Sequence, residues 1–266
     1  RRRMKCFSTI EMPALTHCLG PAISPALERA GTAKSFKPIQ IYGQLLQQLP
    51  QAAHVWFRLH PDTINTLAFE TAGFSSSVQW TVEIAPTAGD VLWKQMRDKT
   101  RNAIRRAGDV LQVEISEDSE FFLNFYNSCL REAGRKNSYD QDCLKRLVAE
   151  ATERNRGRIL VAASADGTPQ AAIFTVWDTK REYYFMSSRR AGAHFGAVNL
   201  LLWHSLQNAA ACGRIFDMDG IHVVGTQLPN LLLLSGFGGN IVPRYCVSRS
   251  CAAASFLRKA GRALRR

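Results

Sequence analysis

The sequence predicts an α/β (α+β) fold of tandem mixed sheets flanked by helices, with the first copy incomplete. Between about Leu92 and Val247, helical and alternating apolar patterns follow one another in the order β–α–α–β–β–β–α–β–α–β. The dipeptide Asp166-Gly167 between two apolar runs is typical of a hairpin turn. A shorter αβαβ run precedes this stretch and repeats part of its order.

The first helix of the main copy is predicted to run from Val91 to Gly108 as one element, because glycine is a common helix stop. Its apolar face repeats at helical spacing: Trp93, Met96, Thr100, Ile104 and Ala107. A basic stripe lies beside this face: Lys94, Arg97, Arg101 and Arg105. We expect the stripe to bind phosphates of an acceptor or another polyanion, with a solvated helix face as the alternative.

The later elements follow from the same patterns, with acidic residues in the first turn of one helix and a capping residue before another. Acidic residues open the helix after Ser116, and Asp140 precedes the next one, both favourable at a helix N-terminus. The expected order is strand 111–115, helices 116–133 and 140–156, strands 159–164, 171–177 and 183–187, loop 189–196, helix 197–212, strand 214–217, helix 227–234, a glycine-rich turn at 236–239, strand 241–247 and a basic helix 252–264.

The first third of the chain shows a fragment of this order. A helix is expected at 36–49, a strand at 55–59, a helix at 64–72 and a strand at 78–84. Residues 72–74 (Ala-Gly-Phe) follow their helix as residues 235–237 (Ser-Gly-Phe) follow the later one. This favours an internal duplication, although a common αβαβ rhythm gives the same pattern. We therefore expect a partial half at 1–88, a complete domain at 89–250 and a basic C-terminal helix at 251–266.

Composition limits the class of protein and its partners. Hydrophobic residues make up 46% of the 266 residues and charged residues 21%, which is ordinary for a folded protein. The net charge of +12 favours polyanions such as nucleic acid, CoA phosphates, nucleotide sugars or anionic lipid, although a basic protein need have no such partner. No apolar run approaches the roughly 18 residues of a membrane span, and no secretory signal is visible. The seven cysteines form no CxxC pair and no zinc-spaced cluster, so we expect a cytoplasmic protein with reduced thiols and no metal site.

Five segments carry a resemblance to a known group: residues 93–107, 183–184, 196–203, 216–221 and 236–239. Together they resemble the Fem-like branch of the GCN5-related N-acetyltransferase (GNAT) superfamily. That branch includes aminoacyltransferases that build peptidoglycan bridges and acetyltransferase-like proteins linked to envelope polysaccharides. The resemblance implies two GNAT-like halves. Bridge-forming members usually carry Phe-Lys before the glycine-rich turn, where this chain has Leu233 and Leu234. This departure favours a divergent acyltransferase.

The resemblance also implies a donor site at the start of the helix that begins at Ala197. GNAT-like proteins lay the donor's phosphates over a helix N-terminus, where free N–H groups and the helix dipole favour negative charge. The expected residues are Arg189, Arg190, Gly192, His194, Gly196 and Ala197. The match to the usual Gln/Arg-x-x-Gly-x-Gly/Ala signature is partial, because His194 stands where the last small residue belongs. An ordinary loop with surface arginines is the alternative.

Three residues are candidates for the chemistry: Asp217, Asp219 and Tyr184. The two aspartates lie two apart on a strand end, so both can face one side and orient or deprotonate an acceptor amine. One of them is expected to hold the Gly220 turn through its side chain instead, and we assign that role to Asp219. Adjacent tyrosines point to opposite faces, so one of Tyr183 and Tyr184 is expected in the core and the other at the acceptor.

The leading functional hypothesis is transfer of an acyl group from acyl-CoA to an amine or hydroxyl of a small-molecule or envelope-precursor acceptor, such as a cell-envelope sugar or amino compound. A second hypothesis takes aminoacyl-tRNA as the donor, since arginines and lysines near the C-terminus suit an RNA backbone. A third is a nonenzymatic nucleic-acid-binding protein on a GNAT scaffold. The sequence predicts no oligomeric state.

Overall fold

The structure is a computed structural model that describes residues 2–4, 7–21, 36–63, 65–221, 223, 226–228 and 230–251. The chain forms two compact units: residues 1–79 together with 243–266, and residues 80–242. The basic helix predicted at 252–264 lies outside the described residues.

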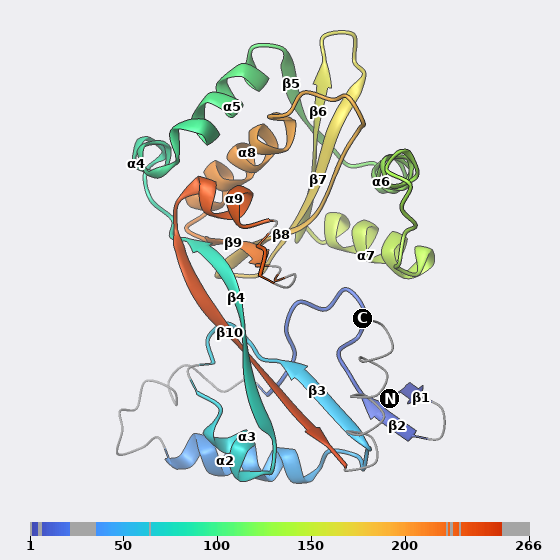
Figure 1. Cartoon of the computed structure of the whole chain (residues 1–266), viewed down its shortest axis with the longest axis vertical. Helices are drawn as coiled ribbons and strands as arrows, with labels where there is room; N and C mark the ends of the chain where they lie inside the picture. Colours follow the sequence, from blue (N-terminus) through green and yellow to red (C-terminus); the bar gives the residue numbers. More distant parts are fainter. Residues whose placement is uncertain are drawn as a thin grey trace. The chain divides into compact units, whose positions relative to one another are not determined.

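The first unit holds the shorter αβαβ run (Figure 1). Its elements are β1 (Arg2–Met4), β2 (Phe7–Ile10), α2 (Phe36–Gln47), β3 (His54–Arg58), α3 (Leu67–Thr71), the first part of β4 (Ser75–Ile84) and the end of β10 (Asn240–Ser250). β2 pairs with β1 in antiparallel and with β3 in parallel orientation, and β3 pairs with β10 in antiparallel orientation. Phe57, Phe69, Phe74 and Val247 are among the residues that form its core.

The second unit contains a mixed sheet with the strand order β4-β9-β8-β7-β6-β5. Its further strands are β5 (Leu111–Ser116), β6 (Gly157–Ser164), β7 (Pro169–Trp177), β8 (Arg181–Arg189) and β9 (Ile215–Gly220). Neighbouring strands are antiparallel except β8 and β9, which are parallel. The predicted hairpin is confirmed: Gly167 has φ = 81° in the turn between β6 and β7, where glycine is favoured.

Helices cover both faces of this sheet. Figure 1 shows α5 (Asp98–Gly108) and α8 (Ala197–Ala211) on one face, and α6 (Ser119–Glu132) and α7 (Gln141–Glu153) on the other. The N-caps of α6 and α7 are aspartates: Asp118 accepts the Phe121 N–H at 2.9 Å, and Asp140 accepts the Cys143 N–H at 2.8 Å. The main core lies between the sheet and the two helices α5 and α8. The predicted α/β class is thus confirmed.

The prediction of one continuous helix from Val91 to Gly108 is wrong, because this segment forms two helices. α4 (Gly89–Gln95) and α5 are separated at Met96 and Arg97, whose backbones are extended, with ψ = 150° and 143°. In a continuous helix the Arg97 N–H would bond back into α4. It instead donates to the carbonyl oxygen of Gly236 at 3.0 Å, in the glycine-rich turn far along the chain. Tertiary packing therefore interrupts a locally helical sequence.

The last elements also differ in extent from the prediction. The helix expected at 227–234 is the short α9 (Leu231–Leu234), followed by a 3₁₀ turn at Ser235–Phe237. The helix expected at 64–72 is limited to α3, while β9 runs to Gly220 rather than ending at Asp217. Gly238 and Gly239 both have positive φ, 83° and 84°, which explains why this turn is rich in glycine.

Candidate functional site

The parallel strands β8 and β9 are joined at one end and separate at the other. Their residues pair at Arg181–Ile215, Glu182–Phe216 and Tyr183–Asp217, and the pairing stops there. Beyond this point β8 stays paired with β7 as far as Arg189, and β9 pairs with β4 as far as Gly220. The facing edges of β8 and β9 are therefore unpaired with each other beyond Tyr183 and Asp217.

The N-terminus of α8 lies at this diverging end. α8 ends at Ala211, shortly before β9 begins at Ile215 beside the start of β8. Because α8 connects the two parallel strands, it runs antiparallel to them, and its first residue is nearest the far end of β8. The helix thus points its N–H groups toward the region where the strands separate.

Tyr184 is the first residue of β8 beyond the last pair with β9. A register shift in the β7–β8 ladder leaves the next residue, Phe185, without a partner opposite it, which makes a β-bulge. The Tyr184 hydroxyl donates to Ser187 Oγ across this bulge. Burial raises the pKa of the Tyr184 phenol, a rise that the Ser187 hydrogen bond opposes and the nearby charge of Asp219 supports. Tyr184 therefore keeps its proton at neutral pH.

Asp217 is fully buried, with 0% of its surface exposed. It accepts a hydrogen bond from Thr81 Oγ1 at 2.6 Å and from the Asp219 N–H at 2.9 Å. These contacts join β4 to β9 and hold the turn before Gly220. The Asp217 side chain therefore helps to hold this turn, and the turn-holding role predicted for Asp219 stays a prediction.

Asp219 differs from Asp217 in backbone and exposure. Its φ is 63°, in the left-handed region that Asp tolerates better than most residues, and its side chain is half-buried. Its carbonyl oxygen accepts a hydrogen bond from Thr81, and its carboxylate acts on the pKa of Tyr184. The structure thus brings Asp219 and Tyr184 together on the diverging ends of β9 and β8.

Gly196 sets the position of the α8 N-terminus. It is the N-cap of α8, and no side chain caps the helix there. A Cβ on Gly196 would lie 2.2 Å from the carbonyl oxygen of Ala103 and 3.2 Å from the Cβ of Ala107, both in α5. Only glycine allows this approach, so α5 holds the start of α8 in place.

The loop before α8 contains the other predicted donor residues. His194 Nδ1 accepts the Gly196 N–H at 3.1 Å, and the His194 carbonyl oxygen accepts the Ala197 N–H at 3.0 Å. The histidine that replaces the small residue of the signature therefore satisfies two amides within the loop. Gly192 occupies an open turn with φ = 77°.

The two arginines predicted to bind the donor have different partners. Arg189 is exposed, and its guanidinium donates to the Phe195 carbonyl oxygen at 3.4 Å, which keeps it beside the loop. Arg190 faces α6 instead, where its Nε is 3.9 Å from Glu132 Oε1. Glu132 also accepts the Ala191 N–H at 3.0 Å. Arg189 is therefore better placed than Arg190 to meet an anion.

The basic stripe of α4 and α5 is partly engaged in local contacts. Arg101 turns back to the end of α4, donates to the Lys94 carbonyl oxygen at 3.0 Å and pairs with Asp98. The Arg105 guanidinium stacks over the Trp93 ring, 5.2 Å from its centroid. Lys94 and Arg97 are exposed. The break between the helices thus divides a stripe that was predicted to be continuous.

Sequence analysis missed three residues that hold the predicted ones in place: Thr81, Ser187 and Glu132. None lies in a motif, and Thr81 and Glu132 are far along the chain from their partners. Among the described residues, no group of three or more His, Cys, Asp or Glu is arranged to hold a metal ion.

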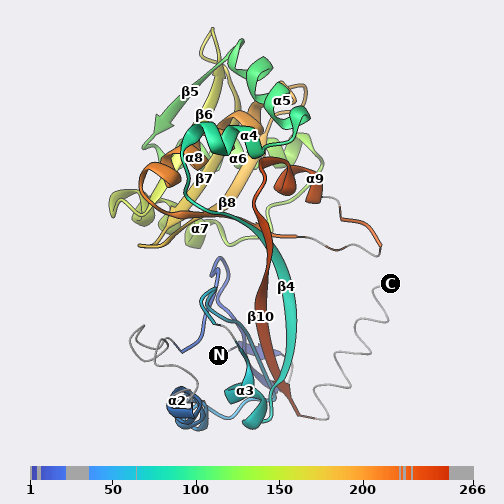
Figure 2. The ribbon, with the colours of Figure 1, turned by 90° about the vertical axis from the view of Figure 1, so that its left-hand side faces the viewer.

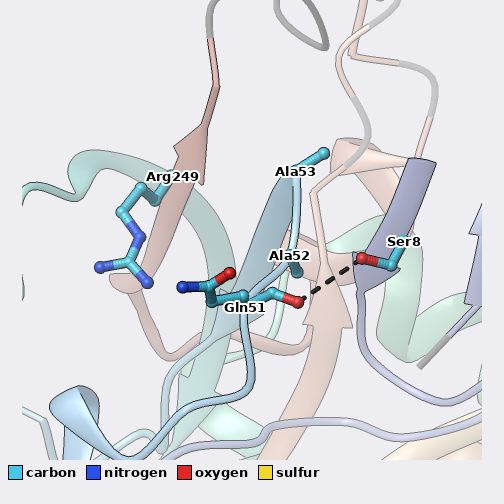
Figure 3. Close-up of a pocket in the computed structure, with 5 residues that line it drawn as sticks. All are labelled: Ser8, Gln51, Ala52, Ala53 and Arg249. Atoms are coloured by element: carbon cyan, nitrogen blue, oxygen red, sulfur yellow. Dashed lines mark hydrogen bonds between the residues drawn. The ribbon is translucent and has the colours of Figure 1, made fainter.

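Two hollows lie away from these residues. Figure 3 shows one of about 420 Å³ in the first unit, lined by Ser8, Gln51, Ala52, Ala53 and Arg249. Its arginine stacks over Phe74, 4.7 Å from the ring centroid. The other, of about 460 Å³, lies beside β5 and the start of α6, with apolar Val161 and Phe121 and acidic Glu114 and Glu117 in its lining. Neither is lined by a predicted site residue.

Comparisons with known proteins give one family match and several solved structures with a similar fold. Residues 94–221 match the family model described as an acetyltransferase (GNAT) domain. No curated protein matches the chain in sequence.

Solved structures with the same fold include FemX, with a TM-score of 0.63, 9% identity, and coverage of 81% of this chain and 77% of that one. The C-terminal domain of a protein assigned as a lysylphosphatidylglycerol synthetase from Agrobacterium fabrum also has a TM-score of 0.63 and 15% identity, and the match covers 85% of this chain and 78% of that one. L-PGS from Bacillus licheniformis has a TM-score of 0.51 and 14% identity, and the match covers 79% of this chain and 71% of that one. Residues 94–221 therefore match a GNAT acetyltransferase domain, and the chain shares its fold with these solved structures.

Proposed function

We propose that this protein transfers an acyl group from acyl-CoA to an amine or hydroxyl of a cell-envelope sugar or amino compound. The observation that carries the proposal is the separation of β8 from β9 at the N-terminus of α8, within the segment that matches a GNAT domain. The donor's phosphates would lie at the α8 N-terminus beside Arg189. Its thioester would lie along the unpaired edge of β8, next to the Phe185 bulge.

The chemistry follows from the two polar groups on the diverging strands. The acceptor nitrogen attacks the thioester carbonyl carbon, a C–N bond forms and the C–S bond breaks. The amine proton passes to Asp219, and the departing thiolate takes a proton from Tyr184. A phenol with a raised pKa suits this second role, because it is protonated at neutral pH. Asp217, which is buried and already accepts two hydrogen bonds, positions Asp219.

The acceptor class rests on fold likeness and on a departure in sequence. FemX and the lysylphosphatidylglycerol synthetase domain share the fold, and the second name includes a membrane lipid. Leu233 and Leu234 replace the Phe-Lys pair of bridge-forming proteins. These observations support an envelope-related acceptor other than a peptidoglycan bridge.

One observation favours a second donor, aminoacyl-tRNA, at the same site. His194 occupies the N–H groups of Gly196 and Ala197, which reduces the number of amides open to a CoA pyrophosphate. A larger polyanion depends less on these amides, because it contacts many cationic side chains. The net charge of +12 supports such contacts.

Titration calorimetry with acetyl-CoA, and with charged tRNA in a second series, tests this proposal. We expect acetyl-CoA to bind, and Arg189→Gln to weaken its binding about fivefold, since an exposed charge contributes about 1 kcal/mol. Arg135→Gln, an equally exposed arginine at the end of α6, is the control and is expected to bind like the parent protein. Equal binding of acetyl-CoA by both variants would show that Arg189 does not contribute to the donor site. Binding of charged tRNA without any binding of acetyl-CoA would make aminoacyl-tRNA the donor.

A further inference from the structure

Four large apolar side chains are exposed around the connection between β9 and α9. Leu232 on α9 is 71% exposed, Val223 is 66% exposed and Leu228 is 42% exposed. Trp80 on β4 is 46% exposed, and its carbonyl oxygen accepts the Ile221 N–H at 2.7 Å, so it adjoins the same connection. We call these four residues the β9–α9 patch. Single exposed apolar residues are common, but several together mark a contact surface.

The chain around this patch lacks negative charge. From Gly220 to the end of the sequence there is no Asp or Glu. The segment that carries Val223, Leu228 and Leu232 therefore contains no acidic residue. This combination argues against a purely solvated loop.

The basic helices α4 and α5 contact the glycine-rich turn that follows α9. The Arg97 N–H donates to the Gly236 carbonyl oxygen at 3.0 Å, and a Cβ on Gly238 would lie 2.8 Å from the Gln95 side chain. The α4–α5 segment is therefore in contact with the turn that follows α9, and Figure 2 shows α4 and α9 next to each other. Residues 89–108 contain six Lys or Arg and two Asp, a net charge of +4. Arg97 and Lys99 are exposed.

An anionic lipid surface suits exposed leucine, valine and tryptophan with cations nearby better than a nucleic acid does. Anionic lipid attracts the cations through its headgroups and accepts apolar side chains at the boundary of its acyl chains, where tryptophan is favoured. A nucleic-acid backbone would use the cations and leave the leucines in water. Among the described residues, no helix is long and apolar enough to cross a membrane.

We propose that the β9–α9 patch and the exposed cations of α4 and α5 form a docking surface for an anionic membrane. The apolar side chains enter the headgroup region while Arg97 and Lys99 meet the lipid phosphates. This inference concerns where the protein works, and it stands independently of the donor and of the transfer chemistry.

Co-sedimentation with vesicles tests the proposal without any donor or acceptor. The full chain is mixed with vesicles of phosphatidylcholine alone, or of phosphatidylcholine with phosphatidylglycerol, and the bound fraction is measured. We expect binding to the anionic vesicles and a decline as salt rises. Leu232→Ser should weaken binding about tenfold, through lost apolar burial, and Lys99→Gln about fivefold, through one lost charge.

Matched variants separate docking from general stickiness. Ile115→Ser removes a side chain of similar exposure, 66%, on β5, and Lys136→Gln removes an exposed charge beyond α6. Both should bind anionic vesicles like the parent protein. Equal weakening by Ile115→Ser and Leu232→Ser, or no binding to anionic vesicles at all, would overturn the proposal. Concentration-dependent self-association that Leu232→Ser abolishes, without vesicle binding, would show that a second copy covers the patch instead.

Discussion

Two adjacent tyrosines at the start of β8 have different surroundings, and the difference decides their roles. Tyr183 is 6% exposed and donates to Asp178 Oδ2 at 3.2 Å, away from the diverging strands. Tyr184 lies beyond the last β8–β9 pair, beside Ser187 and within the influence of Asp219. Tyr183 is the more buried of the two, while Tyr184 packs against the main core and also adjoins the diverging strands.

Replacement of each tyrosine by phenylalanine tests this assignment. Tyr184→Phe removes the proton that the leaving thiolate takes in our proposal, and we expect kcat to fall about a hundredfold with little change in the KM for the donor. Tyr183→Phe is the control, because it removes a hydroxyl of the same kind one residue away, and its kcat should stay near the parent value. Steady-state kinetics with acetyl-CoA measures both. A Tyr184→Phe enzyme with full kcat would show that another group protonates the thiolate.

At the scale of elements, the contact between α5 and α8 places the candidate donor site. The start of α8 approaches the backbone of α5 so closely at Gly196 that no side chain fits. A helix N-terminus is useful for binding only where its amides are held still, and this contact supplies the support. The same pair of helices covers the sheet face that holds the main core.

Gly196→Ala tests that contact. The added methyl group would meet the Ala103 carbonyl oxygen at 2.2 Å, so α8 must shift, and we expect the free energy of unfolding to fall by about 2–3 kcal/mol. Gly89→Ala, at the start of α4 with no atom within 4 Å of the new Cβ, should change it by less than about 0.5 kcal/mol. Urea denaturation measures both. If the two variants are equally stable, α5 does not fix the position of α8.

Much of the second unit could be predicted from the sequence because its signals are local. Apolar periodicity, the Asp118 and Asp140 caps and the Asp166-Gly167 turn each act within a few residues. The helix break at Met96 could not be predicted, because it depends on a hydrogen bond to Gly236 from a distant segment. The contacts of Asp217 could not be predicted for a similar reason. Thr81, on another strand, fixes Asp217 in the interior, and the positive φ of Asp219 cannot be inferred from spacing.

At the scale of the molecule, the chain contains a second unit that includes most of the GNAT match and a first unit with an αβαβ order. The predicted donor loop, the catalytic candidates and the diverging strands all belong to the second unit. The patch proposed to meet a membrane belongs to that unit as well. Donor binding and docking can therefore be measured separately on one protein.

Hydrogen exchange of the full chain, with and without saturating acetyl-CoA, tests most directly whether the donor lies where β8 and β9 separate. We expect acetyl-CoA to slow exchange at the amides of residues 198 and 199, in the first turn of α8, and of residues 184–187, along the unpaired edge of β8. Unchanged exchange in both segments, with protection confined to another part of the chain, would contradict the account.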